Sequence, residues 1–159
     1  MSKTLIAYFS ASGQTEKLAK TLAEVLGADI YAIKPETPYT REDLDWTTKK
    51  SRSSIEMADS SFRPPLAENT QGMEAYGTIF VGFPIWWYVA PTIINTFLES
   101  FDTAGKTIIP FATSGGSGMG KTNAALKPSC PESRLLEGRV FKAGASAVEL
   151  KSWVESLGL

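Results

Sequence analysis

Short apolar runs alternate with segments of helical periodicity along most of the chain. The runs at 4–9 and 78–83 are almost continuously apolar, which is typical of strands buried on both faces of a parallel sheet. The first helical segment carries Leu18, Leu22 and Leu26 four residues apart and ends at Gly27. We predict strands at 4–9, 29–33, 78–83, 107–112 and 139–141. We predict helices at 16–26, 44–58, 92–101, 121–126 and 147–157.

The helix at 44–58 is predicted from the stretch Thr40 to Asp43, which is a variant of the capping box. Strands that alternate with helices favour an α/β fold built on a doubly wound, five-stranded parallel sheet. The whole chain, residues 1–159, is expected to form a single domain. In such sheets ligands bind beyond the carboxyl ends of the strands. The loops after the first, third and fourth strands are therefore the candidate functional loops.

The composition excludes several kinds of site. The 159 residues include no histidine and only one cysteine, Cys130. A Ser-His-Asp triad, a histidine-ligated metal and a disulfide within the chain are therefore excluded. With 16 basic and 17 acidic residues the net charge is -1, which predicts neither nucleic-acid nor membrane-surface binding. The longest apolar stretch contains Gly82 and Pro84 and is too short to span a membrane, so a cytoplasmic location is expected.

The first candidate loop follows the first strand and leads into a helix. It contains three hydroxyl groups and one glycine but no basic side chain, and its residues are Ser10, Ala11, Ser12, Gly13, Gln14 and Thr15. Free amides and the positive end of a helix dipole favour an anion at such a position. The loop therefore favours phosphate binding, although the same residue types also occur in an ordinary helix cap.

The second candidate loop is aromatic and follows the third strand, with the sequence Pro84, Ile85, Trp86, Trp87 and Tyr88. Because neighbouring side chains cannot both point into the core, we expect at least one of the two tryptophans to be exposed or to cover a ligand. A flat aromatic side chain suits stacking on a planar heterocycle. The alternative is an anchor in a protein interface, where tryptophan and tyrosine are common.

The third candidate loop is rich in glycine and begins with Thr113, Ser114, Gly115 and Gly116. Residues 115–122 match the Walker A pattern of nucleotide hydrolases. However, no aspartate ends a predicted buried strand, and the helix that follows is soon broken by Pro128. A glycine loop whose amides approach the edge of a flat ligand is the favoured interpretation.

Taken together, the three loops make the chain resemble a flavodoxin over essentially its whole length. The motif [ST]-x-[ST]-G-x-T of that family is met by Ser10 to Thr15. The stretches FVGFPIWWYVAP and PFATSGGSGMG are similar to a bacterial subgroup with a Trp-Trp pair and a Ser-Gly-Gly loop. The resemblance implies a three-layer fold with strand order 2-1-3-4-5 and bound FMN. It also implies that Ser10, Ser12, Gly13, Gln14 and Thr15 hold the phosphate, that residues 84–88 flank the ring, and that residues 113–116 lie at its opposite edge.

Two features depart from the family pattern. Flavodoxins are typically strongly acidic, whereas this chain is close to neutral. In addition, the family often places a glycine where a peptide flips toward the reduced flavin, and residues 84–90 contain none. Since a bulky Tyr88 would disfavour a positive φ there, stabilisation of the one-electron reduced flavin is in question.

The leading hypothesis is an FMN-binding protein that transfers electrons between a reductase and an acceptor protein, with no catalytic residue or metal of its own. One alternative is an NAD(P)H-dependent FMN or quinone oxidoreductase on the same fold. Two others are a P-loop nucleotide hydrolase and a binding module that has lost the flavin. The sequence does not assign the tryptophan that faces the ring, or the oligomeric state.

Overall fold

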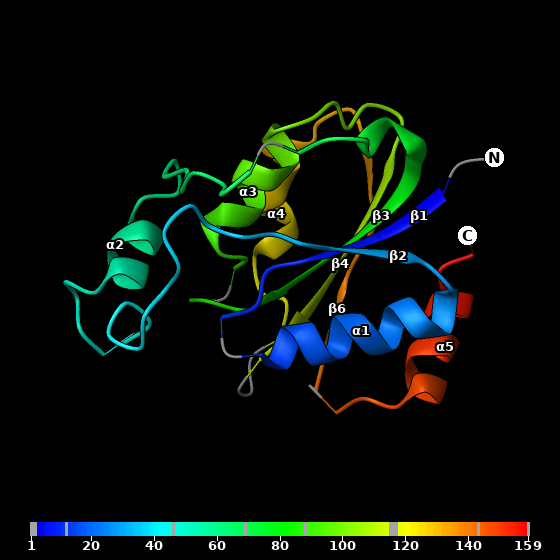
Figure 1. Cartoon of the computed structure of the whole chain (residues 1–159), viewed down its shortest axis with the longest axis horizontal. Helices are drawn as coiled ribbons and strands as arrows, with labels where there is room; N and C mark the ends of the chain where they lie inside the picture. The colour runs from blue at the N-terminus through cyan, green and yellow to red at the C-terminus, as the bar shows by residue number, and fades with distance from the viewer. Residues whose placement is uncertain are drawn as a thin grey trace.

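The chain folds around one parallel sheet with helices on both faces (Figure 1). The computed structural model describes residues 3–11, 13–45, 47–68, 70–87, 89–114, 118–142 and 144–158. The strands are β1 (Lys3–Tyr8), β2 (Asp29–Ala32), β3 (Tyr76–Pro84), β4 (Thr107–Thr113), β5 (Arg134–Leu135) and β6 (Arg139–Phe141). The helices are α1 (Gln14–Leu26), α2 (Arg52–Ala58), α3 (Thr92–Glu99), α4 (Thr122–Leu126) and α5 (Ala147–Ser156), with short 3₁₀ turns at Met73–Ala75 and Lys127–Ser129.

The strand order is β2-β1-β3-β4-β5, and every neighbouring pair is parallel. This confirms the predicted doubly wound fold and the order 2-1-3-4-5. Successive side chains along each strand point to opposite faces of the sheet. Leu5 and Ala7 belong to the core beneath α3 and α4, whereas Ile6 belongs to the core beneath α1 and α5. No helix in the part of the chain that the structure describes is long and apolar enough to cross a membrane.

The last position of the sheet is shared by two short strands that both pair with β4. The predicted fifth strand is β6, and β5 was not predicted. Ile108 O accepts a hydrogen bond from Leu136 N at 2.9 Å, so Pro110, two residues on, faces the same neighbour. A side chain on Gly138 would lie only 2.3 Å from Pro110 O. The proline thus lacks its N–H at the point where β5 has ended and β6 has not begun, which explains why a strand interior tolerates it.

The predicted helix at 44–58 is wrong in its first half. Thr40 and Asp43 do form the reciprocal hydrogen bonds of a capping box, but these close a turn rather than open a helix. Asp45 then accepts from the backbone N–H of Thr47, and such local bonds compete with helix formation. The helix α2 begins only after Ser51, whose hydroxyl accepts from Ser54 N.

We call residues 33–75, which join β2 to β3, the α2 segment. A bridge between Pro35 and Leu66 closes its base, and Ala67 N donates to Lys34 O at 2.8 Å. Figure 1 shows α2 beyond the end of the sheet from which the first turn of α1 starts. The α2 segment therefore extends the molecule at the edge where the candidate loops lie.

Candidate functional site

The three candidate loops meet at the carboxyl edge of the sheet, and Thr113 joins them. Its carbonyl oxygen accepts from Ile85 N at 2.9 Å, which ties the loop after β3 to the end of β4. Its hydroxyl lies 2.8 Å from the hydroxyl of Thr15, in the first turn of α1. Segments about a hundred residues apart are thus connected through one side chain and its backbone.

The first loop presents neutral hydrogen-bond donors at the start of α1. Gly13 caps the helix with φ of 88°, a conformation that favours glycine. Its N–H donates to Ser10 Oγ at 3.0 Å, so the Ser10 hydroxyl proton stays available to a ligand. Gln14 and Thr15 open the helix, and a glycine cap has no side chain to accept from the free amides of this first turn. Ser12 lies outside the described residues.

The hydroxyl pair of Thr15 and Thr113 is almost fully buried, at 1% and 4% exposure. Either oxygen can be the donor of the shared hydrogen bond, so one of the two hydroxyl protons remains for a further partner. This buried pair lies next to the helix terminus. It adds a neutral donor there without adding charge.

In the second loop the two tryptophans lie in different environments, as expected for neighbouring side chains that cannot both point into the core. Trp86 packs edge-on against Phe9 and Tyr39, with ring centroids 5.7 and 5.5 Å away. Trp87 is 43% exposed and has φ of 50°. The exposure of Trp87 meets the prediction that at least one of the two is exposed or covers a ligand. Tyr88 lies outside the described residues.

The turn of the second loop is held by its neighbours. Trp86 N donates to Val89 O at 2.9 Å, and Val89 N donates back to Trp86 O at 3.1 Å. Pro84 ends β3, and Ile85 packs against the core beneath α3. The backbone thus reaches the left-handed region at a tryptophan, without the glycine that such a turn usually needs.

A cluster that the sequence analysis did not identify supports Trp86 from the α2 segment. Tyr39 donates its hydroxyl to Glu56, a carboxylate only 3% exposed. The Arg52 guanidinium lies 3.8 Å above the Tyr39 ring, and its Nε donates to Glu56 Oε2 at 3.0 Å. Burial, followed by the bond to Glu56, raises the pKa of Tyr39 above its usual value. The residues are 17 or fewer positions apart but follow no motif, so no sequence signal pointed to them.

In the third loop Thr113 is the last residue of β4 and Ser114 is half-buried, whereas Gly115 and Gly116 lie outside the described residues. Beyond them Thr122 is fully buried, and its hydroxyl donates to Met119 O at 2.6 Å. The Walker A interpretation needs that hydroxyl to face a metal ion, and it needs a longer helix than the five residues of α4. Both observations weigh against a nucleotide hydrolase.

The described residues therefore offer two kinds of surface at one edge of the sheet. At the start of α1, neutral hydroxyls and helix amides suit a phosphate group held without a cation. At the end of β3, aromatic side chains suit a flat ring. The donor set fits a phosphate ester of a planar heterocycle.

Comparison with known proteins agrees with this geometry. The profile of the family described as Flavodoxin matches residues 3–157. A Bacteroides eggerthii protein, classed provisionally as a flavoprotein, is 43% identical with a TM-score of 0.94, over 100% of this chain and 99% of its own. A similarly classed Bacteroides uniformis protein is 49% identical with a TM-score of 0.92, over 97% and 98%.

Two more distant relatives share a lower sequence identity with this chain. A Lactobacillus acidophilus flavoprotein, solved in complex with FMN, has the same fold at 21% identity and a TM-score of 0.72, over 97% of this chain and 99% of its own. Rat NAD(P)H dehydrogenase [quinone] 1 is 24% identical over 110 residues, which are 65% of this chain. The match covers 40% of the rat protein, so the chain spans well under two thirds of that curated relative.

Proposed function

This chain belongs to the flavodoxin family, and from that premise we propose that it binds FMN and transfers electrons between redox partner proteins. The observation that carries the proposal is the meeting of the three loops at Thr113. When bound, the flavin supplies the redox chemistry, and the protein supplies binding and orientation.

The residues of the first loop would hold the FMN phosphate. These are Ser10, Ser12, Gly13, Gln14 and Thr15. The free proton of Ser10 and that of the Thr15–Thr113 pair can be donated to phosphate oxygens, and the start of α1 favours their negative charge. The FMN complex of the Lactobacillus acidophilus relative supports FMN as the ligand.

The other two loops would hold the ring. Residues 84–88 would flank it, with Trp87 as the exposed aromatic side chain and Trp86 as its support, and residues 113–116 would lie along its opposite edge.

The binding experiment is an FMN titration followed by tryptophan fluorescence. We expect quenching in the unmodified protein and most of it lost in Trp87→Phe. Trp153→Phe is the matched control, because Trp153 packs on Phe80 and Phe141 in the core beneath α1 and α5. Colourless protein and unchanged fluorescence on adding FMN would contradict the proposal.

A second candidate function is an NAD(P)H-dependent quinone oxidoreductase, favoured by the similarity to the rat enzyme over 110 residues. Anaerobic mixing of FMN-loaded protein with NADPH separates the two. An electron carrier keeps its oxidised absorption until a reductase protein is added, whereas the enzyme is bleached by NADPH alone. A cytoplasmic location, with which the single thiol agrees, stays a prediction.

A further inference from the structure

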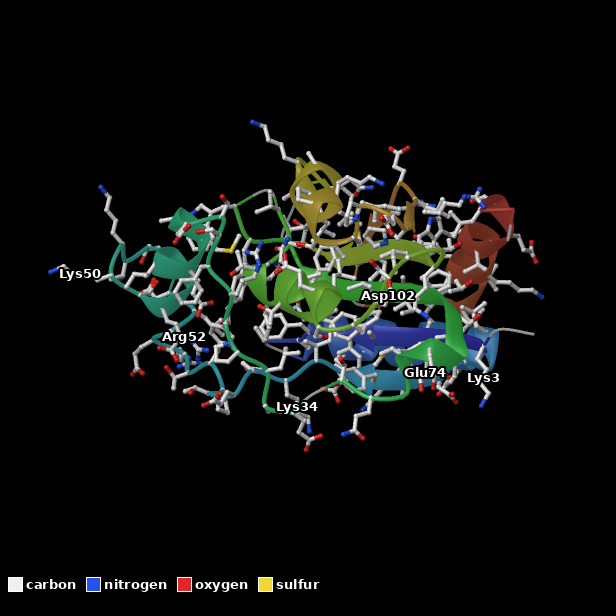
Figure 2. The ribbon with its side chains drawn as sticks, turned by 90° about the horizontal axis from the view of Figure 1, so that it is seen from above. Lys3, Lys34, Lys50, Arg52, Glu74 and Asp102 are labelled. Atoms are coloured by element: carbon white, nitrogen blue, oxygen red, sulfur yellow. The ribbon has the colours of Figure 1, made fainter. Side chains whose placement is uncertain are left out.

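A cavity of about 320 Å³ lies where α3 ends and β4 begins, at the edge of the sheet opposite the candidate loops. Three of its lining residues are acidic, namely Glu99, Asp102 and Glu132. Figure 2 shows Asp102 well away from Lys50 and Arg52, which belong to the α2 segment. We propose that this cavity, which we call the amino-edge cavity, binds a short linear diamine in its doubly charged form. The proposal goes beyond the proposed function and does not involve the flavin.

Two of the three carboxylates are available to a cation. Glu99 accepts from Arg63 Nε at 2.9 Å and from Ser129 Oγ at 2.6 Å, so its charge is already paired. Asp102 and Glu132, by contrast, take part in no ion pair within the described ranges. No basic side chain is among the described lining residues. The amino-edge cavity therefore carries negative charge that the described residues leave uncompensated.

The nearest basic residue along the chain does not neutralise this charge. Lys106 is buried, and its ammonium group donates to Met73 O at 2.9 Å and to Tyr76 O at 2.6 Å. Both acceptors lie at the start of β3, away from Glu132, which precedes β5. The charge of Lys106 is thus directed toward backbone carbonyl groups.

A buried hydroxyl without a partner points to a ligand independently of the carboxylates. Thr103 lines the cavity and is only 7% exposed, yet its hydroxyl forms no hydrogen bond with any residue that the structure describes. In the same described ranges the fully enclosed hydroxyl oxygens without a partner are those of Ser53 and Thr92, so the Thr103 oxygen is reached from the cavity. Hydroxyls in buried residues normally have a partner, because an unsatisfied one costs free energy. An ammonium group in the cavity would donate to it.

The remaining lining favours an organic cation over a metal ion. Leu98, Phe101, Ala104 and Pro131 give the cavity apolar walls, and an ammonium group is attracted to the face of an aromatic ring. Among the described residues no group of three acidic side chains is arranged to hold a metal ion. A linear diamine can place one charge at Asp102 and the other at Glu132, while its methylene groups contact the apolar walls.

The backbone around the cavity adds to the preference for a cation and fixes the carboxylates. The last turn of α3 contains no basic residue, and the end of a helix favours positive charge. Gly105 N donates to Glu132 O at 3.1 Å, and Ala104 N donates to Asp102 Oδ1 at 2.9 Å. Because these bonds hold both sides of the cavity before a ligand enters, the entropic cost of binding is lowered.

The test is a chemical-shift titration of the full chain with putrescine, a linear diamine, at low salt, on both flavin-free and FMN-loaded protein. We expect saturable shifts at the amides of residues 101–105 and 129–133, with the same affinity in both forms. Neutral butanediol should cause no saturable shift at the same positions. Magnesium ions should not displace the diamine at equal concentration.

The variants assign the binding to individual groups. Asp102→Asn and Glu132→Gln should each weaken the diamine about threefold, and the asparagine keeps an oxygen for Ala104 N. Thr103→Val should weaken it about twofold. Glu74→Gln is the matched control, because Glu74 is exposed, lies in the same half of the molecule as Asp102 in Figure 2, and does not line the cavity. Urea unfolding of each variant verifies that it is folded.

Three results would overturn the proposal. Equal losses in Glu74→Gln and Asp102→Asn would show attraction to the charge of the whole protein rather than binding in the cavity. The same saturable shifts with butanediol would remove the need for a cation, and displacement by magnesium would make the site a metal site. Failure of FMN to bind would contradict the proposed function alone, because the flavin-free titration still tests the cavity.

Discussion

The two loops that define the candidate site both enter the left-handed region of backbone conformation, in opposite ways. Gly13 reaches φ of 88° without a side chain, and an added Cβ would meet no atom within 4 Å. Trp87 reaches φ of 50° with a large ring attached, held by the paired hydrogen bonds between Trp86 and Val89. A non-glycine residue there costs about 1–2 kcal/mol. The phosphate end of the site is therefore relaxed and the ring end is strained.

This difference shows where each geometry comes from. At Gly13 the local sequence is sufficient, because glycine adopts the conformation at little cost. At Trp87 the surroundings impose it, through the turn and through the packing of Trp86 on Phe9 and Tyr39. We therefore expect substitutions at the two ends to act on different quantities.

The largest effect is expected at the hydroxyl pair that anchors the phosphate end. Thr15→Val or Thr113→Val leaves the other buried hydroxyl without its partner and should lower the free energy of unfolding by about 1–3 kcal/mol. The double variant should lose less than the sum of the two, because no orphaned hydroxyl remains. Urea unfolding of the four proteins measures this cycle. Additive losses would show that the two hydroxyls do not interact.

Gly13→Val tests whether the relaxed end depends on its glycine. Valine at positive φ should cost about 1–2 kcal/mol of unfolding free energy and weaken FMN binding about tenfold. The matched control is Gly144→Val, since an added Cβ at Gly144 also meets no atom and its φ lies outside the left-handed region. Equal losses at the two glycines would contradict the conformational explanation.

Tyr39→Phe tests the support of the ring end. It removes the donor to the buried Glu56 carboxylate and should cost about 1–2 kcal/mol at neutral pH. Burial raises the pKa of Tyr39 in the folded protein, so the folded state retains the phenol proton above the usual pKa of about 10. The stability that comes from keeping Tyr39 protonated is complete below the usual tyrosine pKa. It is lost as the pH rises from there toward the raised pKa of the folded protein.

The measurement is unfolding between neutral and strongly alkaline pH. The unmodified protein should lose stability faster above the usual tyrosine pKa than Tyr39→Phe does. Parallel curves would mean that Tyr39 ionises equally in the folded and unfolded states.

The strain at Trp87 is measured by comparing two substitutions that both remove the ring. Asparagine tolerates the left-handed region better than alanine, so Trp87→Asn should be more stable than Trp87→Ala by about 0.5 kcal/mol. Thermal unfolding of both variants provides the comparison. If the alanine variant is the more stable, the turn is not strained in solution.

An ion pair between the α2 segment and the end of α3 gives the smallest effect and serves as a reference. Arg63 Nε donates to Glu99 at 2.9 Å and, together with a bond from Ser129, holds the pKa of Glu99 below its usual value. The stability that the ionised Glu99 contributes is present above the usual glutamate pKa. It is lost as the pH falls through the lowered pKa of Glu99 in the folded protein. Because the pair is exposed, Arg63→Gln should cost no more than about 0.5 kcal/mol at pH 7 and less near pH 3. A constant cost at both pH values would contradict the assignment.

The sheet was predictable because its strands are continuous apolar runs and its first helix has a regular leucine stripe. The pairs that fix the site were not predictable. Thr15 and Thr113 are 98 positions apart, and only the fold, which places the first turn of α1 beside the end of β4, brings their hydroxyls together. The start of α2 was misplaced because the capping residues Thr40 and Asp43 formed their bonds without a helix. The Tyr39 cluster carries no motif, since its function is packing and local hydrogen bonding rather than ligand chemistry.

The central claim is that the first loop holds a phosphate and the second a flavin ring. It is tested most directly by comparing the affinities of the flavin-free protein for FMN and for riboflavin, which lacks the phosphate. Because hydrogen bonds to a charged group contribute about 1.5–3 kcal/mol each, FMN should bind at least about a hundredfold more tightly. Equal affinities for the two flavins would contradict the account.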